Sequence, residues 1–435
     1  MPASSARPPE VTQMNVHATT TPTRTAAEQA LVDGFAARVS DFPGDAATVS
    51  ARDEAVERLK AGLPTRKVEA WHYTDLRRLL AKVPPHDPTA GVEPLAPVLP
   101  DSAILAVRNG IAEAAPAIEG IEIVRVAEAL AEGRMASLAP LDGDDVVTRL
   151  NTAFVTDGFD LLVAEGQDIA TSLELQNLHA GGQVHARFGL KAGRGSTVTV
   201  VERQAGTGEA LSSSVSEVTV EDDASVRWLI VQEQDAGTSH MAQFRARLGR
   251  NARLTLFIMN AGGRLVRQEV RVDQSGEGSD FQLRGVNLLA GEGHTDVTMV
   301  LDHSAPHTTS TELLRNVATD RAHGVFQGQI RVDRIAQKTD ARMACNTLLL
   351  SDDAEFSTKP ELEIFADDVA CGHGATVTEI DHDHLFYLMA RGVDEKTARG
   401  LLVKAFLREV VEELDDEPVV EALEAKLDQW FAEHG

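Results

Sequence analysis

The amino-acid sequence predicts a mainly β protein, in which a stacked solenoid is flanked by helical segments. Between about residues 160 and 376, short alternating apolar runs recur at a nearly constant interval. The runs that contain Val198, Val226, Leu254 and Phe281 are separated by 28, 28 and 27 residues. A constant period with alternation inside each unit is typical of stacked β-strand coils. An antiparallel sandwich is the alternative, and it is less favoured because hairpin strands of ordinary length need fewer residues.

Composition and charge exclude several classes of protein. The chain has 435 residues, 43% of them hydrophobic, and a formal net charge of −26. A chain this acidic has no basic field to neutralise phosphates, so we expect no nucleic-acid partner. No apolar run reaches 18 residues, so we expect no membrane span. Two cysteines are too few for a secreted disulfide scaffold, and we therefore expect a cytoplasmic protein.

Changes in composition divide the chain into four predicted segments. Residues 1–25 are rich in Ser, Thr, Pro and Ala and lack the apolar core of a signal peptide, which predicts a disordered leader. Residues 26–155 are predicted to form a helical and mixed N-terminal domain, with a proline-rich linker over 83–100. The β-solenoid core is expected over 156–378, and a helical C-terminal domain over 379–435.

The N-terminal domain carries helix signals and an aromatic stretch. Ser50 and Asp53 resemble a capping box, and Gly62 is expected to end the helix that they begin. Trp71 and Tyr73 stand out in a chain that is only 4% aromatic, so we expect them to anchor the helices onto the core. Further elements are expected as strands over 103–107 and 121–126 and as a helix from Asp144 to about Phe154.

Three amphipathic helices are predicted after residue 378, beginning near Asp381, Asp394 and Pro418. We expect them to cap one end of the solenoid and protect its open edge, or to serve as a docking surface. The second helix is predicted to carry one apolar face, made of Ala398, Leu401, Leu402, Ala405, Phe406 and Val410.

A candidate site lies in the segment that contains Cys371 and His373. Residues two apart in a strand point to the same face, so this spacing places a thiol beside an imidazole. Gly372 and Gly374 leave the opposite face bare, so another backbone can approach it. Thiolate and imidazole both suit iron, copper and zinc, which makes the pair half of a metal site. A structural buried cysteine beside a hydrogen-bonded histidine is the alternative.

Cys345 lies 26 residues before Cys371, about one period, so we expect the two sulfurs on adjacent coils and near each other. Burial of two unrelated thiols is the alternative. There is no G-x-x-x-x-G-K-[ST] motif, so this chain is not expected to bind or hydrolyse ATP. Four histidines fall in the later coils, and most are expected to be satisfied surface or turn residues: His294, His303, His307 and His323.

Several stretches resemble the SufB/SufD family. The resemblance is carried by residues 69–76 (EAWHYTDL), 150–154 (LNTAF), 336–340 (AQKTD), 361–377 (ELEIFADDVACGHGATV) and the tail from Tyr387 to Phe406. Matches extend from about residue 60 to 415. The run 359–364 (KPELEI), the cysteine two before His373 and the N-terminal W-x-Y-T-D-L are similar to the SufD branch rather than the SufB branch.

The resemblance implies a right-handed parallel β-helix between helical domains, in a scaffold subunit for iron–sulfur cluster assembly. It implies pairing with a SufB-like paralogue and a SufC-like ATPase, and a homodimer when the chain is isolated. A transient iron–sulfur cluster, or iron, would be held at the partner interface by His373 with Cys371 beside it. Cys345 departs from the SufD pattern and is either an extra ligand or an incidental thiol. The implied ATPase-docking residues are Leu401, Leu402, Ala405 and Phe406.

Two other functions are weighed against the scaffold. The chain is alternatively the SufB-type scaffold itself, which the identity of co-purified partners would decide. It is alternatively a β-helix enzyme acting on acidic polysaccharide, but such an enzyme needs a basic groove, which a net charge of −26 disfavours. We therefore expect no enzymatic activity.

Overall fold

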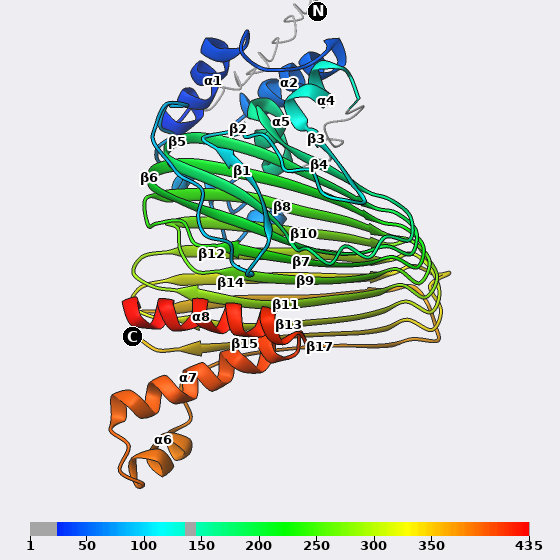
Figure 1. The fold of residues 1–435 in the computed structure, drawn as a ribbon. Coiled ribbons are helices and arrows are strands. Elements are labelled where there is room, and N and C mark those ends of the chain that lie inside the picture. The colour runs from blue at the N-terminus through cyan, green and yellow to red at the C-terminus, as the bar shows by residue number, and fades with distance from the viewer. Residues whose placement is uncertain (1–23, 135–144, 435) are drawn as a thin grey trace, which may run out of the picture.

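The computed structural model describes residues 24–134 and 145–434, and it is a parallel β-solenoid of about eight turns. Figure 1 shows the strands stacked in a column, with helices gathered at the N-terminal end and beside and beyond the C-terminal end. The helices are α1 (Ala26–Arg38), α2 (Ala46–Leu59), a 3-10 turn at Glu69–Trp71, α3 (Leu76–Leu79), α4 (Val126–Ala131), α5 (Val146–Phe154), α6 (His382–Met389), α7 (Glu395–Glu412) and α8 (Glu417–His434).

The strands alternate between two faces of the solenoid. They are β1 (Ala103–Arg108), β2 (Ile111–Ala112), β3 (Ile121–Arg125), β4 (Asp157–Val163), β5 (Leu173–Ala192), β6 (Thr197–Val220), β7 (Ser225–Gln232), β8 (Thr238–Leu248), β9 (Arg253–Asn260), β10 (Leu265–Gln274), β11 (Asp280–Leu289), β12 (His294–His303), β13 (Thr309–Ala318), β14 (His323–Val332), β15 (Asp340–Leu349), β16 (Glu355–Ile364) and β17 (Ala370–Thr378).

From β5 to β15, each strand pairs in parallel with the strand one coil further on, which confirms the predicted solenoid and excludes the sandwich. The long strands β5 and β6 contribute to both faces. The first half of β6 then leads to β7, β9, β11, β13, β15 and β17 (the odd face), and its second half leads to β8, β10, β12, β14 and β16 (the even face). The periodic runs are in register, since Val198 pairs with Val226, Val226 with Leu254 and Leu254 with Phe281.

One corner of the solenoid is a stack of left-handed turns. The residue at this position has a φ of about +50° to +70° in six successive coils, and its backbone N–H donates to a carbonyl of the next coil. For example, Asp223 donates to Arg250 at 2.8 Å and His307 to Gln337 at 2.9 Å. Gly, Asn and Asp tolerate this conformation best, which explains the turn residues between the runs. The stack consists of Gly195, Asp223, Asn251, Gly278, His307 and Lys338.

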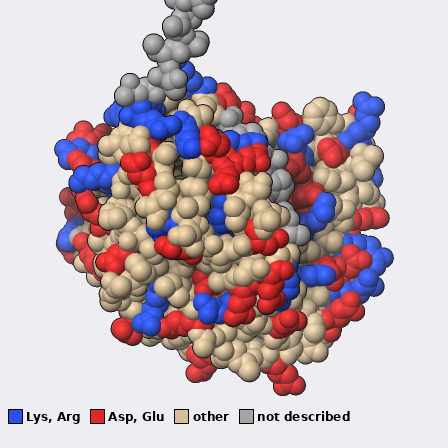
Figure 2. All heavy atoms as spheres, turned by 90° about the horizontal axis from the view of Figure 1, so that it is seen from above, with Lys and Arg blue, Asp and Glu red and all other residues tan. Residues whose placement is uncertain are grey.

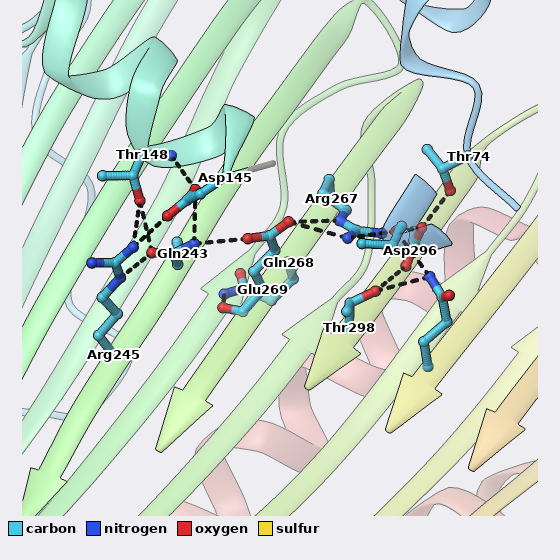
Figure 3. Close-up of polar contacts among 12 residues, drawn as sticks. Thr74, Asp145, Thr148, Gln243, Arg245, Arg267, Gln268, Glu269, Asp296 and Thr298 are labelled. Carbon is cyan, nitrogen blue, oxygen red and sulfur yellow. Dashed lines mark hydrogen bonds and ion pairs between the residues drawn. The ribbon is translucent and has the colours of Figure 1, made fainter. Parts of the chain in front are cut away.

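The N-terminal segment packs on the outer side of the even face, as predicted for Trp71. The Trp71 ring is fully buried and lies under the guanidinium of Arg267, 4.4 Å from the ring centroid. Arg267 also donates to the carbonyl of Ala70 at 3.0 Å and to Asp296 at 2.5 Å. Thr74 donates to Asp296, and Figure 3 shows how this network continues through Glu269 toward Asp145. Tyr73 is only half-buried, so Trp71 is the anchor.

The C-terminal helices lie along the side of the odd face, so the prediction that they cap the end is wrong. Their apolar residues form one cluster with the outward side chains of this face, among them Leu229, Phe257 and Val317. This outward apolar stripe stabilises the lateral position by burial. The apolar face predicted for α7 is only partly the buried one. The buried residues of α7 are Ala398, Val403, Leu407, Val410 and Val411, of which only Ala398 and Val410 belong to the predicted face.

Several other local predictions can be compared with the structure. Helix α2 begins at Asp45, whose side chain accepts from the Thr48 N–H at 2.9 Å, so the predicted start at Ser50 is wrong. The predicted strands and the helix ending at Phe154 are confirmed, and residues 83–100 contain no helix or strand. The predicted leader falls, up to residue 23, outside the described residues. Within the described ranges, no helix has the length and apolar character needed to cross a bilayer.

The turn stack generates a stability prediction. His307 is exposed and has a φ of 59°, a conformation that costs a residue with a Cβ about 1 kcal/mol or more. His307→Gly should therefore raise the free energy of unfolding by about 0.5 kcal/mol, after the added freedom of the unfolded chain is subtracted. Gly278→Ala, at the equivalent turn, should lower it by about 1 kcal/mol. Urea unfolding midpoints measure both, and a destabilised His307→Gly variant would contradict the strain assigned to this position.

Candidate functional site

The solenoid is open at its C-terminal end. Strand β16 pairs with β14 and β17 pairs with β15, and no described strand pairs with the outer edge of either. The residues of both strands are largely exposed or half-buried, unlike those of the coils before them. An unpaired strand edge presents free N–H and C=O groups, which can pair with another chain. The open end is therefore the surface of this molecule best suited to strand-to-strand association.

Cys371 and His373 lie on the inner side of β17, in the last coil. In register, Cys371 follows Ala341 and His373 follows Met343, both of which are buried in the solenoid interior. Cys371 is partly buried against the interior core, whereas His373 is exposed at the open end. The two side chains share a face, as predicted. The bare outer face at Gly372 and Gly374 is not approached by any described backbone, because a Cβ there would meet nothing within 4 Å.

Cys345 is on the adjacent coil but is not beside Cys371, so that prediction is wrong. Cys345 pairs with Ala375, while Cys371 pairs with Ala341, four residues earlier on β15. At about 3.3 Å per residue, this separates the two positions by about 13 Å along the strand. The reason is that this coil has 30 residues, measured from Ala341 to Cys371, so a spacing of 26 residues falls four short of one coil. Burial raises the pKa of the Cys345 thiol to about 12, which makes it an inert buried thiol in this chain.

A ladder of side-chain amides inside the solenoid ends at Cys345. Asn260 donates to Asn287 at 2.7 Å, Asn287 to Asn316 at 2.7 Å, and Asn316 to the Cys345 sulfur at 3.3 Å. Each of these three asparagines donates to the next rung, although Asn260 Oδ1 itself has no hydrogen-bond partner among the described residues. The sequence analysis missed the ladder, although its amides recur at the same interval as the apolar runs. The amides occupy one register position in six coils: Asn177, Gln204, Gln232, Asn260, Asn287 and Asn316.

The late-coil histidines do not gather around a sulfur. His294 is buried on the outer side of the even face, 2.9 Å from the Thr74 hydroxyl and edge-on to His323. His303 points into the interior, where it contacts Thr308 at 2.8 Å, and burial lowers its pKa to about 4. His307 is a turn residue. The prediction that most of them are satisfied surface or turn histidines fits only His307, because His294 and His303 are buried. His323 is half-buried, and its Nε2 has no hydrogen-bond partner among the described residues.

A buried carboxyl that the sequence analysis missed lies two coils behind His373. Glu312 is 1% exposed on the inner side of β13, and neither carboxylate oxygen has a hydrogen-bond partner among the described residues. Burial raises the pKa of Glu312 to about 8, and the nearby Ser310 hydroxyl and Arg284 guanidinium offset only part of this effect.

An exposed apolar surface is formed by α6 and the first half of α7, which project beyond the last coil in Figure 1. Of the predicted docking residues, Leu401 is 50% exposed and Ala405 is exposed, whereas Leu402 and Phe406 are half-buried against the odd face. Sequence analysis did not include three α6 residues of this surface, Phe386, Tyr387 and Met389, which are 71%, 55% and 42% exposed.

The arrangement can supply part of a metal site and no more. Among residues 24–134 and 145–434, no three His, Cys, Asp or Glu side chains are placed to hold one metal ion. Cys371 and His373 offer one thiolate and one imidazole, which is an incomplete ligand set for iron or zinc. Figure 2, which looks onto the N-terminal end, shows acidic and basic side chains interspersed, in keeping with the acidic composition.

Comparison with known proteins identifies a family. The profile of "SUF system FeS cluster assembly, SufBD core domain" matches residues 175–406. The chain is similar to "Iron-sulfur cluster assembly protein SufD" of Escherichia coli, with 28% identity over 87% of this chain and 92% of that protein. A SufBD family protein of Synechocystis is 29% identical over 63% of each chain. "Protein ABCI7, chloroplastic" of Arabidopsis thaliana is 32% identical over 52% of this chain and 48% of its own length.

The resemblance noted in the sequence and the observed solenoid agree with these matches. The profile spans the coils from β5 to β17 together with α6 and part of α7, which include the open end. The chain therefore belongs to the SufBD core family of the SUF system for FeS cluster assembly.

Proposed function

We propose that this chain is a non-catalytic scaffold subunit for iron–sulfur cluster assembly in the cytoplasm, of the SufD type. Its partners would be a SufB-like paralogue and a SufC-like ATPase, as the relationship to SufD suggests. The observation that carries the proposal is the open end, where two unpaired strand edges lie next to Cys371 and His373. Iron or a nascent cluster is the cargo of this site.

The SufB-like paralogue is assigned to the open end. A second solenoid docked edge to edge would extend the sheets beyond β16 and β17 and satisfy their free backbone groups. Docking would also cover Cys371 and His373 and bring the paralogue's own ligands to them. The incomplete ligand set of this chain supports such a shared site, because two ligands hold a metal ion poorly. An isolated chain has the same edges, which supports a homodimer when no partner is present.

The ATPase is assigned to the α6–α7 surface. This surface is apolar and exposed, and the chain has no phosphate-binding motif of its own, which supports a separate ATP-binding partner. Leu401 and Ala405 are accessible docking residues, and Phe386 and Tyr387 extend the surface on α6. Leu402 and Phe406 support α7 from below, because they pack against the solenoid.

The alternative assignment to the SufB branch is tested by the partners. A chain of the SufD type should purify with a distinct SufB-like paralogue, whereas a SufB-type chain should purify with a SufD-like one. The polysaccharide enzyme is disfavoured by the acidic composition, since an acidic substrate needs a basic groove.

The docking assignment predicts that Leu401→Asp weakens binding of the SufC-like ATPase. A carboxylate buried without a partner at an interface costs several kcal/mol, so affinity should fall by more than about tenfold. Titration calorimetry with the purified ATPase measures this. Val49→Asp is the matched control, because Val49 is 44% exposed and lies on α2, far from this surface. Unchanged ATPase affinity in a folded Leu401→Asp chain would remove the docking assignment.

The site assignment predicts that His373→Ala lowers the iron and sulfide content of the reconstituted complex while the complex still assembles. His373 is exposed at the open end, so truncation of its side chain should leave β17 intact. Loss of a ligand should weaken iron retention by roughly tenfold or more. His72→Ala, at an exposed histidine of the N-terminal segment, is the control. Iron loading equal to that of the unmodified complex would exclude His373 from the site.

A further inference from the structure

The last coil of the solenoid is far more acidic than the coil before it. Residues 351–380, which contain β16 and β17, include eight Asp or Glu residues and one Lys, a formal net charge of −7. Residues 319–350 form the preceding coil and include three acidic and five basic residues, a net charge of +2. Acidic residues are therefore concentrated on the coil whose strand edges are unpaired.

Most of this negative charge is not neutralised within the chain. Three of the eight carboxylates form ion pairs: Glu361 with Lys359, Glu363 with Arg331 and Asp368 with Lys338. The other five form no ion pair with a described residue. They are exposed, and they lie around the start of β16, in the turn before β17 and just after β17: Asp352, Asp353, Glu355, Asp367 and Glu379.

An exposed apolar corner lies beside the unpaired edges. Ile335 lies in the turn after β14 and Phe365 in the turn after β16, one coil further on, and they are 69% and 58% exposed. The two turns are stacked, because the Phe365 N–H donates to the Val332 carbonyl at 2.9 Å. Ile364, at the end of β16, is 41% exposed. Large apolar side chains gathered on a surface are typical of the part of an interface that a partner buries.

We propose that the unpaired edges and the apolar corner bind a second solenoid whose own end coil is basic, and that the acidic last coil keeps two copies of this chain apart at low ionic strength. The apolar corner would be buried in this interface, with the five unpaired carboxylates around it. The inference rests on the proposed function in taking the open end as the surface that binds a paralogue. It adds the charge that the end coil of that paralogue must carry.

Charge distinguishes the two solenoids that could bind the open edges. Unpaired backbone groups accept any strand, so a second copy of this chain satisfies them as well as a paralogue does. Two copies of this chain would bring two end coils of net charge −7 against each other. Like charges that face each other across an interface oppose binding, whereas a basic end coil would pair with the free carboxylates. The acidic coil therefore favours the mixed pair.

The test uses a charge-inverted copy of this chain as the basic partner. Five substitutions by Lys change the net charge of residues 351–380 from −7 to +3: D352K, D353K, E355K, D367K and E379K. The unmodified chain carries a fluorescent label, and sedimentation velocity measures its association. In about 50 mM NaCl it should be a monomer alone and a dimer in the mixture, and about 500 mM NaCl should weaken the mixed dimer by roughly tenfold, because salt screens exposed charges.

Two matched controls separate the open end from the rest of the molecule. The first carries five Lys substitutions at exposed carboxylates toward the N-terminal end, so its total charge equals that of the inverted copy: D53K, E119K, E122K, E128K and E165K. It should form no dimer with the unmodified chain in about 50 mM NaCl. For the apolar corner, Phe365→Ala in the unmodified chain should weaken the mixed dimer by about tenfold. Ile111→Ala, at a residue of β2 that is 50% exposed, should leave it unchanged.

A mixture that does not dimerise, or that dimerises equally with the N-terminal control, would overturn the proposal. The carboxylates would then only protect the edges from non-specific pairing. Unchanged affinity in Phe365→Ala would remove the apolar corner from the interface. If the inverted copy does not fold, the unmodified chain decides, because its self-association should be tighter in about 500 mM than in about 50 mM NaCl. Equal or weaker self-association at the higher salt would overturn the proposal.

Failure of the scaffold function is a separate result. It would appear as the absence of SufB-like and SufC-like partners on co-purification, while the mixed dimer of the unmodified and inverted chains still formed. Conversely, co-purification of both partners without a mixed dimer would remove the charge selection and leave the scaffold function in place.

Discussion

The structure depends on backbone hydrogen bonding between successive coils. Every strand of a parallel solenoid needs a neighbour on both sides, and any coil without one exposes unpaired N–H and C=O groups. At the N-terminal end, β1 and β4 pair in parallel with β5 and so provide that neighbour. At the C-terminal end β16 and β17 have a neighbour on one side only within the described chain. The C-terminal end therefore presents a surface for edge-to-edge association.

The interior of the solenoid contains polar as well as apolar side chains, and two kinds of polar group stand out. In the amide ladder from Asn177 to Asn316, three hydrogen bonds join successive coils: Asn177 donates to Gln204, Asn260 to Asn287 and Asn287 to Asn316. Such a ladder pins the register, since a slip of one residue would place every amide among apolar side chains. Glu312 is unsatisfied and lies where the ladder's last coils approach the open end. The late coils therefore hold both hydrogen-bonded amides and a carboxyl without a hydrogen-bond partner among the described residues.

The period of the sequence predicted the fold well. Every coil needs a polar turn followed by a strand whose alternate residues point into the interior, so the same pattern recurs in each coil. It also predicted the shared face of Cys371 and His373, a local property of any strand. It failed for Cys345, because the coils are not of constant length and the last one has 30 residues, four more than the spacing between the two cysteines. The lateral position of α7 depends on apolar residues that point outward from the odd face, such as Phe257. In the sequence, these residues cannot be distinguished from the inward apolar residues with which they alternate. The amide ladder could have been found in the sequence, because its residues recur at the same interval as the apolar runs. Glu312 belongs to no such repeat, so it could be found only after the inner face of β13 was known.

The central claim, that the open edges of β16 and β17 pair with a SufB-like partner, is tested most directly by amide hydrogen exchange with and without that partner. In the isolated chain, the amides of β16 and β17 should exchange faster than those of β14 and β15, which have neighbours on both sides. Addition of the partner should slow exchange throughout β16 and β17 to the level of the inner coils. A stable complex in which β16 and β17 exchange as fast as in the isolated chain would contradict the account.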